Sequence, residues 1–289
     1  MATIDEFKTQ KYAEGIRILQ SQKLSRLEGY VSVETDISER KAFDQLGDDE
    51  SLDEMFGRNT DTPISEADHR RRWIYTRDFD KGFLLDRADE IRLLNNPINA
   101  YTRKFVSMAN RKKDDLLIEA FDASAITGKT GTGSVAFDAA FSIAAGGVSM
   151  TTDKVKDAHE RLVEAENDID DPMNMLCLAM SENQITNLLN ETEITSSDFN
   201  TQRVLVNGKL DQWYGFKIIQ TQRLPLAGGV RTCFAWCKSS MKLGIDGSEL
   251  TRVEQRADKR YSTQAYAMRH YGATRMDEKG VVRIFCTEA

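Results

Sequence analysis

The sequence predicts an α+β fold, and its order of segments and its composition both support this. Helical and strand-like segments are mixed along the 289 residues without the regular β-α-β rhythm of a doubly wound sheet. Apolar residues make up 40% of the chain and charged residues 29%, so a sizeable core can form. No internal repeat is visible.

The first 85 residues are mostly polar with scattered aromatic residues, a composition that is unusual for a globular core. Residues 1–28 have loose helical spacing and predict an arm that becomes ordered against another surface. In 29–85, two strand-like runs flank the acidic stretch 44–58. Because two strands alone are marginally stable in water, we interpret 29–85 as an extended hairpin that needs a partner surface.

A long helix is the clearest predicted element. Pro97 suits a first helical turn, and apolar residues then recur at helical spacing to Phe121. The predicted helix, 97–121, is about 37 Å long at 1.5 Å per residue. Its centre, 111–115, is wholly charged, so we expect it to span a domain rather than sit inside one.

Shorter elements are predicted around this helix. A short helix is expected at 86–94 and a loop or weakly paired segment at 122–150, after which Thr152 caps another helix. The further expected elements are strands at 173–180, 204–206, 216–220, 230–236, 266–270 and 281–286, a helix at 183–190 and a turn at 277–280.

The net charge of −7 disfavours tight sequence-specific binding of nucleic acid, which usually requires a basic surplus or a basic face. A local basic strip remains compatible with this balance. The first residues are polar and lack the apolar core of a signal peptide, and no run approaches the roughly 20 apolar residues of a membrane span. We therefore expect a soluble protein made in the cytoplasm, with no membrane partner.

Nothing in the sequence predicts catalysis, a cofactor or a metal. Cys177, Cys233, Cys237 and Cys286 lie in apolar runs, where cysteine behaves as a small buried hydrophobe. Cys233 and Cys237 are too far apart in a strand-like run to form a tight ligand pair. His69, His159 and His270 have no neighbours at ligand spacing, and a structural zinc site needs four clustered ligands.

A phosphate-loop-like pattern starts at Ala123 and ends in Gly128-Lys129-Thr130. In a true phosphate loop a strand leads in and a helix starts at the Lys-Thr, whose amides then hold the phosphate. Here a long helix leads in and a glycine-rich stretch follows. The context therefore disfavours nucleotide binding, and measuring ATP binding before and after Lys129→Ala would test it.

Three stretches and the order of elements resemble a known family. The stretches are YTRDFDKGFLLDRADEIRLLNNPINAYTRKFVSMANRKKDDLLIEAF, NGKLDQWYGFKIIQTQRLP and YGATRMDEKGVVRIFC. From about residue 30 onwards the chain resembles the major capsid proteins of tailed bacteriophages, which have the Hong Kong 97-like fold. The resemblance rests on element order and loose similarity, not on an invariant motif.

The resemblance implies a division into domains. Residues 1–28 would be the N-terminal arm and 29–85 the extended loop that overlaps a neighbouring subunit. Residues 86–149 and 250–289 would form a peripheral domain containing the spine helix 97–121, and 150–249 an apical domain.

The resemblance also implies function and partners. The chain would assemble as hexamers and pentamers into the icosahedral head of a virion enclosing double-stranded DNA, with non-specific DNA contact. Because the sequence starts directly at the arm, a separate scaffolding protein is implied, together with a portal protein and possible decoration proteins. A shell of the same fold forming a bacterial compartment remains an alternative, as does the nucleotide-binding enzyme.

The charged part of the loop carries the predicted contact site. We expect Arg70, Arg71 and Arg72 to meet Asp48, Asp49 and Glu50 across subunits, with Trp73 beside them. Exposed ion pairs are each worth only about 0–1 kcal/mol, so many copies would have to act together.

Overall fold

The computed structural model divides the chain into two compact units. Unit 1 comprises Met1–Leu24, Asp78–Lys112 and Ser248–His270, and unit 2 comprises Ser25–Arg77, Lys113–Gly247 and Tyr271–Ala289. The residues described are 21–47, 54, 57, 64, 66–86, 98–167, 171, 174–191, 205–206, 209–247 and 250–288. These units do not follow the domain boundaries expected from the sequence, which remain a prediction. The short helix expected at 86–94 lies almost wholly outside the described residues, as does most of the arm.

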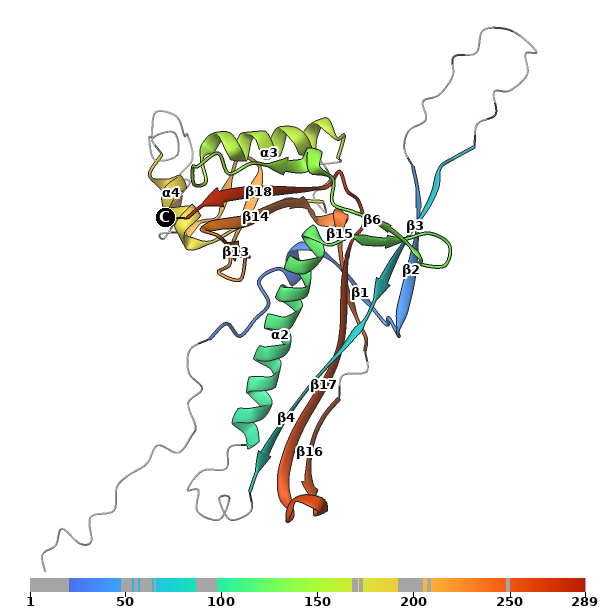
Figure 1. The fold of residues 1–289 in the computed structure, drawn as a ribbon, viewed down its shortest axis with the longest axis vertical. Helices are drawn as coiled ribbons and strands as arrows, with labels where there is room; N and C mark the ends of the chain where they lie inside the picture. The colour runs from blue at the N-terminus through green and yellow to red at the C-terminus, as the bar shows by residue number, and fades with distance from the viewer. Residues whose placement is uncertain are drawn as a thin grey trace, which may run out of the picture. The chain divides into compact units, whose positions relative to one another are not determined.

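A seven-stranded mixed sheet forms the main layer of unit 2 (Figure 1). Its strand order is β11-β12-β8-β14-β18-β7, with β13 paired to β14. The strands are β7 (Ser142–Ile143), β8 (Leu176–Met180), β11 (Gln212–Trp213), β12 (Phe216–Gln220), β13 (Leu226–Ala227), β14 (Val230–Cys237) and β18 (Val281–Thr287). Every residue of β8 is buried, because it lies between β12 and β14 and both of its faces are covered.

Two helices accompany this sheet. Helix α3 (Thr152–Glu164) contacts β14 and β18, and Val155, Ala158 and Leu162 are fully buried. The expected cap was one residue off, since the hydroxyl of Thr151, not Thr152, accepts a hydrogen bond from the Lys154 amide. Helix α4 (Glu182–Leu189) follows β8 directly. The strand expected at 173–180 is shorter at its start, while the helices and the strands at 216–220, 230–236 and 281–286 match closely.

The core of unit 2 includes all four cysteines and a group of stacked aromatic rings. Phe121 lies 4.9 Å from Phe234 and 4.7 Å from Trp236, measured between ring centroids. The cysteines are free and none has exposed surface, which confirms their interpretation as core thiols. Burial raises the pKa of the Cys177 and Cys237 thiols to about 12.

Unit 2 also contains two smaller ladders of strands. A four-stranded sheet has the order β2-β3-β5-β6, and β1 lies parallel to β15, which pairs with the last residues of β17. The strands are β1 (Ser32–Thr35), β2 (Arg40–Leu46), β3 (His69–Tyr75), β5 (Ala125–Thr127), β6 (Gly133–Val135), β15 (Met241–Ile245) and β17 (Ser262–Arg275). A separate short pair is β9 (Leu205–Val206) with β10 (Lys209–Leu210).

A close crossing of backbones depends on two glycines that face each other in the β15–β17 pair, Gly244 and Gly272. A Cβ added at Gly272 would lie 2.3 Å from the carbonyl oxygen of Tyr75. A Cβ added at Gly244 would lie 2.5 Å from Ile37 Cδ1. The chain entering and leaving the hairpin can therefore pass directly over this pair of strands.

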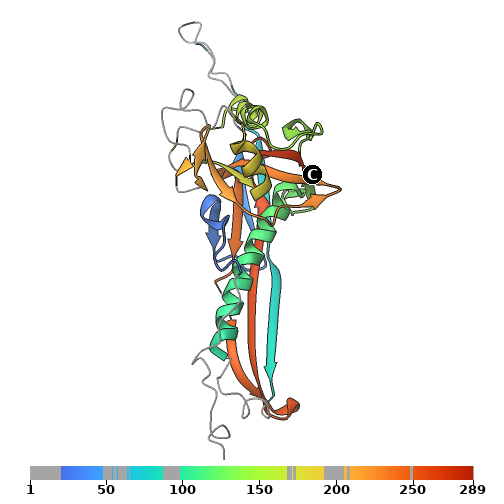
Figure 2. The same cartoon turned by 90° about the vertical axis from the view of Figure 1, so that its left-hand side faces the viewer.

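Unit 1 consists of a ribbon of strands covered by part of one helix (Figure 2). Strands β4 (Arg77–Leu85) and β16 (Leu250–Arg256) both pair with β17. Helix α2 (Ile98–Asp122) confirms the long helix expected at 97–121. Phe105 of α2 packs on Ala265 and Ala267 of β17, beside Phe83 and Tyr101. Both α2 and β17 run without interruption from one unit into the other.

Candidate intersubunit contact site

The β2–β3 hairpin places the predicted arginines in a fixed register. Asp44 lies opposite Arg71, and Ala42 lies opposite Trp73. Because successive residues of a strand point to opposite faces, Arg71 and Trp73 share one face and Arg70 and Arg72 share the other. The acidic members of the predicted site, Asp48, Asp49 and Glu50, lie outside the described residues. Their pairing with the arginines therefore stays a prediction.

Arg70 and Arg71 are surface residues with acidic partners in their own chain. The Nε atom of Arg71 lies 2.5 Å from Asp44, and that of Arg70 lies 2.7 Å from Asp68. The hydrogen bond from Arg71 holds the pKa of Asp44 below its usual value. Both arginines remain substantially exposed, so they are still accessible to a second molecule.

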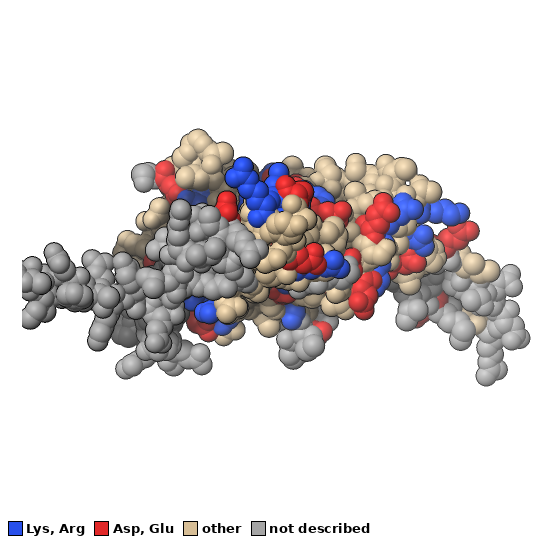
Figure 3. Space-filling view, turned by 90° about the horizontal axis from the view of Figure 1, so that it is seen from below, with Lys and Arg blue, Asp and Glu red and all other residues tan. Residues whose placement is uncertain are grey.

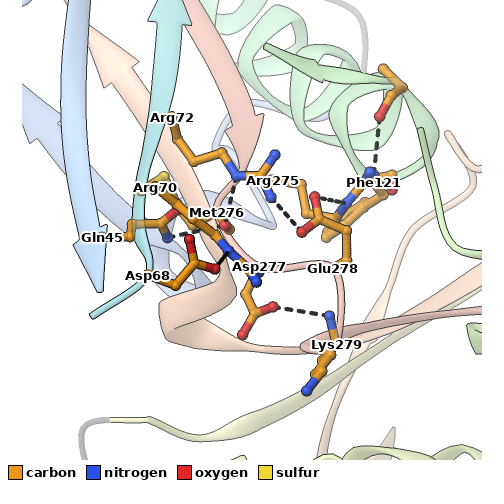
Figure 4. Close-up of polar contacts among 11 residues, drawn as sticks. Gln45, Asp68, Arg70, Arg72, Phe121, Arg275, Met276, Asp277, Glu278 and Lys279 are labelled. Atoms are coloured by element: carbon orange, nitrogen blue, oxygen red, sulfur yellow. Dashed lines mark hydrogen bonds and ion pairs between the residues drawn. The ribbon is translucent and has the colours of Figure 1, made fainter. Parts of the chain in front are cut away.

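Arg72 is different, because it is only 4% exposed and points into the protein (Figure 4). Its Nε donates to the Met276 carbonyl at 3.2 Å, and its Nη2 donates to the Glu278 carboxylate. Arg72 therefore fastens the base of the hairpin to the turn between β17 and β18. This turn, expected at 277–280, is formed as predicted.

A second buried arginine shares the same carboxylate. Arg275 has no exposed side-chain surface, and its Nε lies 3.9 Å from Glu278 (Figure 4). Its Nη1 donates to the carbonyls of Phe121 and Ala123 at 2.8 and 3.0 Å, where the end of α2 leaves acceptors free. Burial lowers the pKa of Arg275. The cluster thus fixes the hairpin, the end of α2 and the β17–β18 turn together.

Trp73 lies on the outer face of the hairpin, half-buried under a turn. Its Nε1 donates to the Gly128 carbonyl at 2.7 Å, and the Arg40 guanidinium lies 5.2 Å from its ring centroid. The turn containing Gly128-Lys129-Thr130 joins β5 to β6. The phosphate-loop-like sequence therefore begins no helix and lacks the amides of a helix N-terminus.

The described residues contain little else that suggests chemistry. No group of three or more His, Cys, Asp or Glu side chains is placed among them to hold a metal ion. His159 packs its ring edge-on to Tyr214, and His270 lies 2.6 Å from Asp78. Among the helices described, none is long and apolar enough to cross a membrane. Figure 3 shows acidic and basic side chains interspersed on one face.

Comparison with known proteins identifies the class and then the family. The chain is a structural protein, because the family whose sequence model it matches consists of capsid proteins. A sequence model of the family described as "Phage capsid protein" matches residues 4–288, so the chain belongs to this family and is a capsid component of the virion. No curated protein sequence matches the chain significantly.

Solved capsid structures share the fold over nearly the whole chain. The capsid of Ralstonia phage GP4 is 10% identical, with a TM-score of 0.73, covering 97% of this chain and 95% of that one. The capsid of cyanophage P-SCSP1u is 13% identical, with a TM-score of 0.71 and coverages of 100% and 96%. A Mycobacterium phage Che8 structure is 12% identical, with a TM-score of 0.69 and coverages of 96% and 97%. The expected Hong Kong 97-like capsid fold is confirmed.

Sequence reasoning identified the arginine triplet but not the residues that bind it. Glu278 and Arg275 lie about 200 residues away in the chain, and only the fold brings them to Arg72. In the sequence, the only feature that draws attention to Arg275 and Glu278 is the charged turn at the end of the stretch YGATRMDEKG.

Proposed function

We propose that this chain is the major capsid protein that assembles as hexamers and pentamers into an icosahedral phage head around double-stranded DNA. The observation that carries this is the family match over residues 4–288 together with a fold shared with phage capsids. Portal, scaffolding and decoration proteins are the further partners we propose, on the basis of the family resemblance.

The hairpin is the element we assign to contacts between subunits. Its outer face carries Arg71 and Trp73, and its two strands lead into the acidic segment that contains Asp48, Asp49 and Glu50. In the same proposal, 29–85 is the extended loop, 86–149 with 250–289 the peripheral domain and 150–249 the apical domain.

Electron microscopy of the purified protein tests the assembly. Uniform icosahedral particles, or separate hexamers and pentamers, are expected across a range of protein concentrations. A protein that stays monomeric at all concentrations and ionic strengths, alone and with a co-expressed scaffolding protein, would contradict the proposal.

The structure shows which arginines should be changed to test the contact of the hairpin with another subunit. Reversing all three arginines would also break the buried Arg72 cluster, so only Arg70→Glu and Arg71→Glu should be combined. We expect this variant to fold normally and assemble poorly. The matched control is Lys81→Glu, an exposed lysine on β4.

A further inference from the structure

Strand β16 forms an edge of its sheet. Among the strands that the structure describes, β16 pairs with β17 alone, and β4 pairs with β17 on its other side (Figure 1). Residues 250–256 pair one-to-one with 262–268, so this ladder contains no bulge. In an antiparallel pair, every second residue turns its amide and carbonyl away from the partner strand. The outer edge of β16 therefore presents backbone groups that no described strand binds.

This edge lacks the features that usually keep an edge strand from pairing with another chain. Such features include lysines, a proline, a bulge or a covering segment. The sequence of β16, LTRVEQR, contains no proline, lysine or glycine, and six of its seven residues are exposed. Its charges are of both signs, from Arg252, Glu254 and Arg256. Charges of one sign would repel a second copy of the strand, whereas charges of both signs attract it when the register brings opposite signs together.

The order of these charges is self-complementary. When two copies of β16 pair antiparallel about a two-fold axis, the register that uses all seven residues places Val253 on the axis, opposite itself. Arg252 then lies opposite Glu254 of the second copy, and Glu254 lies opposite its Arg252. Moving the axis by one residue in either direction places Arg252 or Glu254 opposite itself, which is unfavourable because like charges then face each other. The charges therefore favour the register that pairs the whole strand.

Val253 adds an apolar contact in the same register. Its side chain is 42% exposed, and the residue lies opposite Ala265 of β17. Since directly opposite residues share a face of the sheet, Val253 lies on the face where Phe105 packs against Ala265. In the paired arrangement the two Val253 side chains would contact each other. The small apolar cluster of unit 1 would then continue from one copy into the other.

Within one copy, Arg252 and Glu254 are only loosely paired. The Nη1 atom of Arg252 lies 3.6 Å from Oε1 of Glu254, and both side chains are more than half exposed. Residues two apart on a strand are separated by roughly 7 Å, whereas the Cα atoms of directly opposite residues are only about 4.5–5.5 Å apart. A second copy therefore offers each charge a nearer partner. Arg256 already has an ion pair with Asp258 and needs no acid from the second copy.

We propose that β16 of one copy pairs antiparallel with β16 of a second copy, about a two-fold axis at Val253. Backbone hydrogen bonds between the two edges would join the sheets, and the Arg252–Glu254 pairs would set the register. Neighbouring copies in a closed ring of five or six contact each other head to tail, so a two-fold contact joins copies of different rings. This placement between rings rests on the proposed function, whereas the strand pairing itself does not.

A cysteine on the axis tests the pairing. In Val253→Cys the two introduced thiols would lie opposite each other, and the Cα separation of directly opposite residues falls within the range of about 4.4–6.8 Å that a disulfide requires. The four native cysteines are fully buried and should contribute little background. We expect mild oxidation to link two copies into a covalent dimer, visible on a non-reducing gel. Thr251→Cys is the matched control, because its two thiols would lie roughly 13 Å apart along the ladder and should not link.

Charge substitutions in the Val253→Cys protein test the register. Glu254→Arg places arginines opposite each other, so we expect the yield of linked dimer to fall about tenfold. Adding Arg252→Glu to this variant inverts the order of the charges, restores opposite signs and should restore the yield. Lys259→Glu reverses an exposed cation just beyond β16 and should leave the yield unchanged. Circular dichroism checks that each variant folds.

Several outcomes would overturn the pairing. These are equal linking of Val253→Cys and Thr251→Cys, no linking of Val253→Cys, and a yield that Glu254→Arg does not change. If the thiol at position 253 becomes inaccessible to thiol reagents in particles without linking, a different segment covers β16 and the proposal is wrong.

The experiment also separates the pairing from the proposed function. If electron microscopy shows particles in which Val253→Cys does not link, the pairing fails and the proposed function stands. If dimers link but no particles form, the pairing stands and the proposed function fails.

Discussion

The two compact units differ in how they bury apolar surface and in how they place charge. Unit 2 builds a continuous core from the seven-stranded sheet, α3 and the stacked rings around Phe121. The buried cluster of unit 1 is small, with Phe105, Ala265 and Ala267 packed beside Phe83 and Tyr101. Unit 2 pairs Arg72 and Arg223 with acidic side chains, whereas the four basic residues of α2 in unit 1 form no ion pair with an acidic side chain among the described residues. Among the described residues, unit 2 is therefore stabilised by a large core of its own, and unit 1 by a much smaller one.

Substituting two phenylalanines of helix α2, one in each unit, measures this difference in packing as a loss of stability. Phe121→Ala should lower the free energy of unfolding by about 4 kcal/mol, because the site is enclosed by Phe234 and Trp236. Phe105→Ala should lower it by about 2–3 kcal/mol, since fewer groups surround it. All three tryptophans, Trp73, Trp213 and Trp236, belong to unit 2. Tryptophan fluorescence therefore follows the unfolding of unit 2 alone.

Urea unfolding followed by fluorescence and by circular dichroism separates the two effects. Phe121→Ala should shift the fluorescence transition to lower urea concentration. Phe105→Ala should shift circular dichroism more than fluorescence. Equal shifts of both signals for both variants would show that the two units unfold as one.

Substitutions of Arg71 and Arg72, which are neighbours on β3, compare the loss of an exposed charge with the loss of a buried one. Arg72→Ala should lower the free energy of unfolding by about 3 kcal/mol, because it leaves the Glu278 carboxylate with only the longer contact to Arg275. Arg71→Ala should have no measurable effect on thermal unfolding, since Arg71 and Asp44 face solvent. An equal loss of stability for both variants would contradict the anchoring role of Arg72.

Glu288 tests whether the end of β18 stabilises unit 2. Hydrogen bonds from Arg231, Gln184 and Ser181 lower the pKa of this carboxyl from 4.5 to about 2. Since the folded-state pKa is lowered, the stabilisation of about 3 kcal/mol is present above pH 4.5 and is lost as pH falls through 2. Glu288→Gln should remove it at neutral pH and flatten the acid part of the stability profile. Glu254→Gln, at an exposed site, should leave the profile unchanged.

Gly272 tests the backbone crossing, with the smallest expected effect. Gly272→Ala should lower the free energy of unfolding by about 2 kcal/mol, because the new methyl group would meet the Tyr75 carbonyl. Gly29→Ala is the control, since no atom lies within 4 Å of its added Cβ. Thermal unfolding of both variants provides the measurement, and equal midpoints would contradict the close crossing.

The sequence predicted elements whose pattern is local and missed those that depend on distant partners. The 3.6-residue period of α2 and the apolar run of β8 carry their own signal, and both were found. Strand β16 was missed because six of its seven residues are exposed and charged or polar side chains dominate it. Strand β15 was missed because Lys242 and Gly244 interrupt the apolar residues of MKLGI, which therefore lacks the continuous apolar run that marks β8.

The same limit applies to the contact site. Composition and clustering marked Arg70, Arg71 and Arg72 as notable, yet they could not show that Arg72 alone turns inward. That depends on strand register, which places Arg72 on the core-facing side with Ile74. The acidic partner Glu278 is supplied by a turn about 200 residues later, and no local pattern joins the two.

The buried cysteines give the chain four silent labelling sites. A thiol reacts as its thiolate, and at neutral pH almost none is present when the pKa is about 12, as for Cys177 and Cys237. The hydrogen bond with Cys233 instead lowers the pKa of Cys286, but all four side chains are fully buried. Thiol reagents should therefore modify the subunit only when the core of unit 2 opens. The rate of labelling then measures how often that core opens, both in free subunits and in assembled particles. It needs no engineered probe.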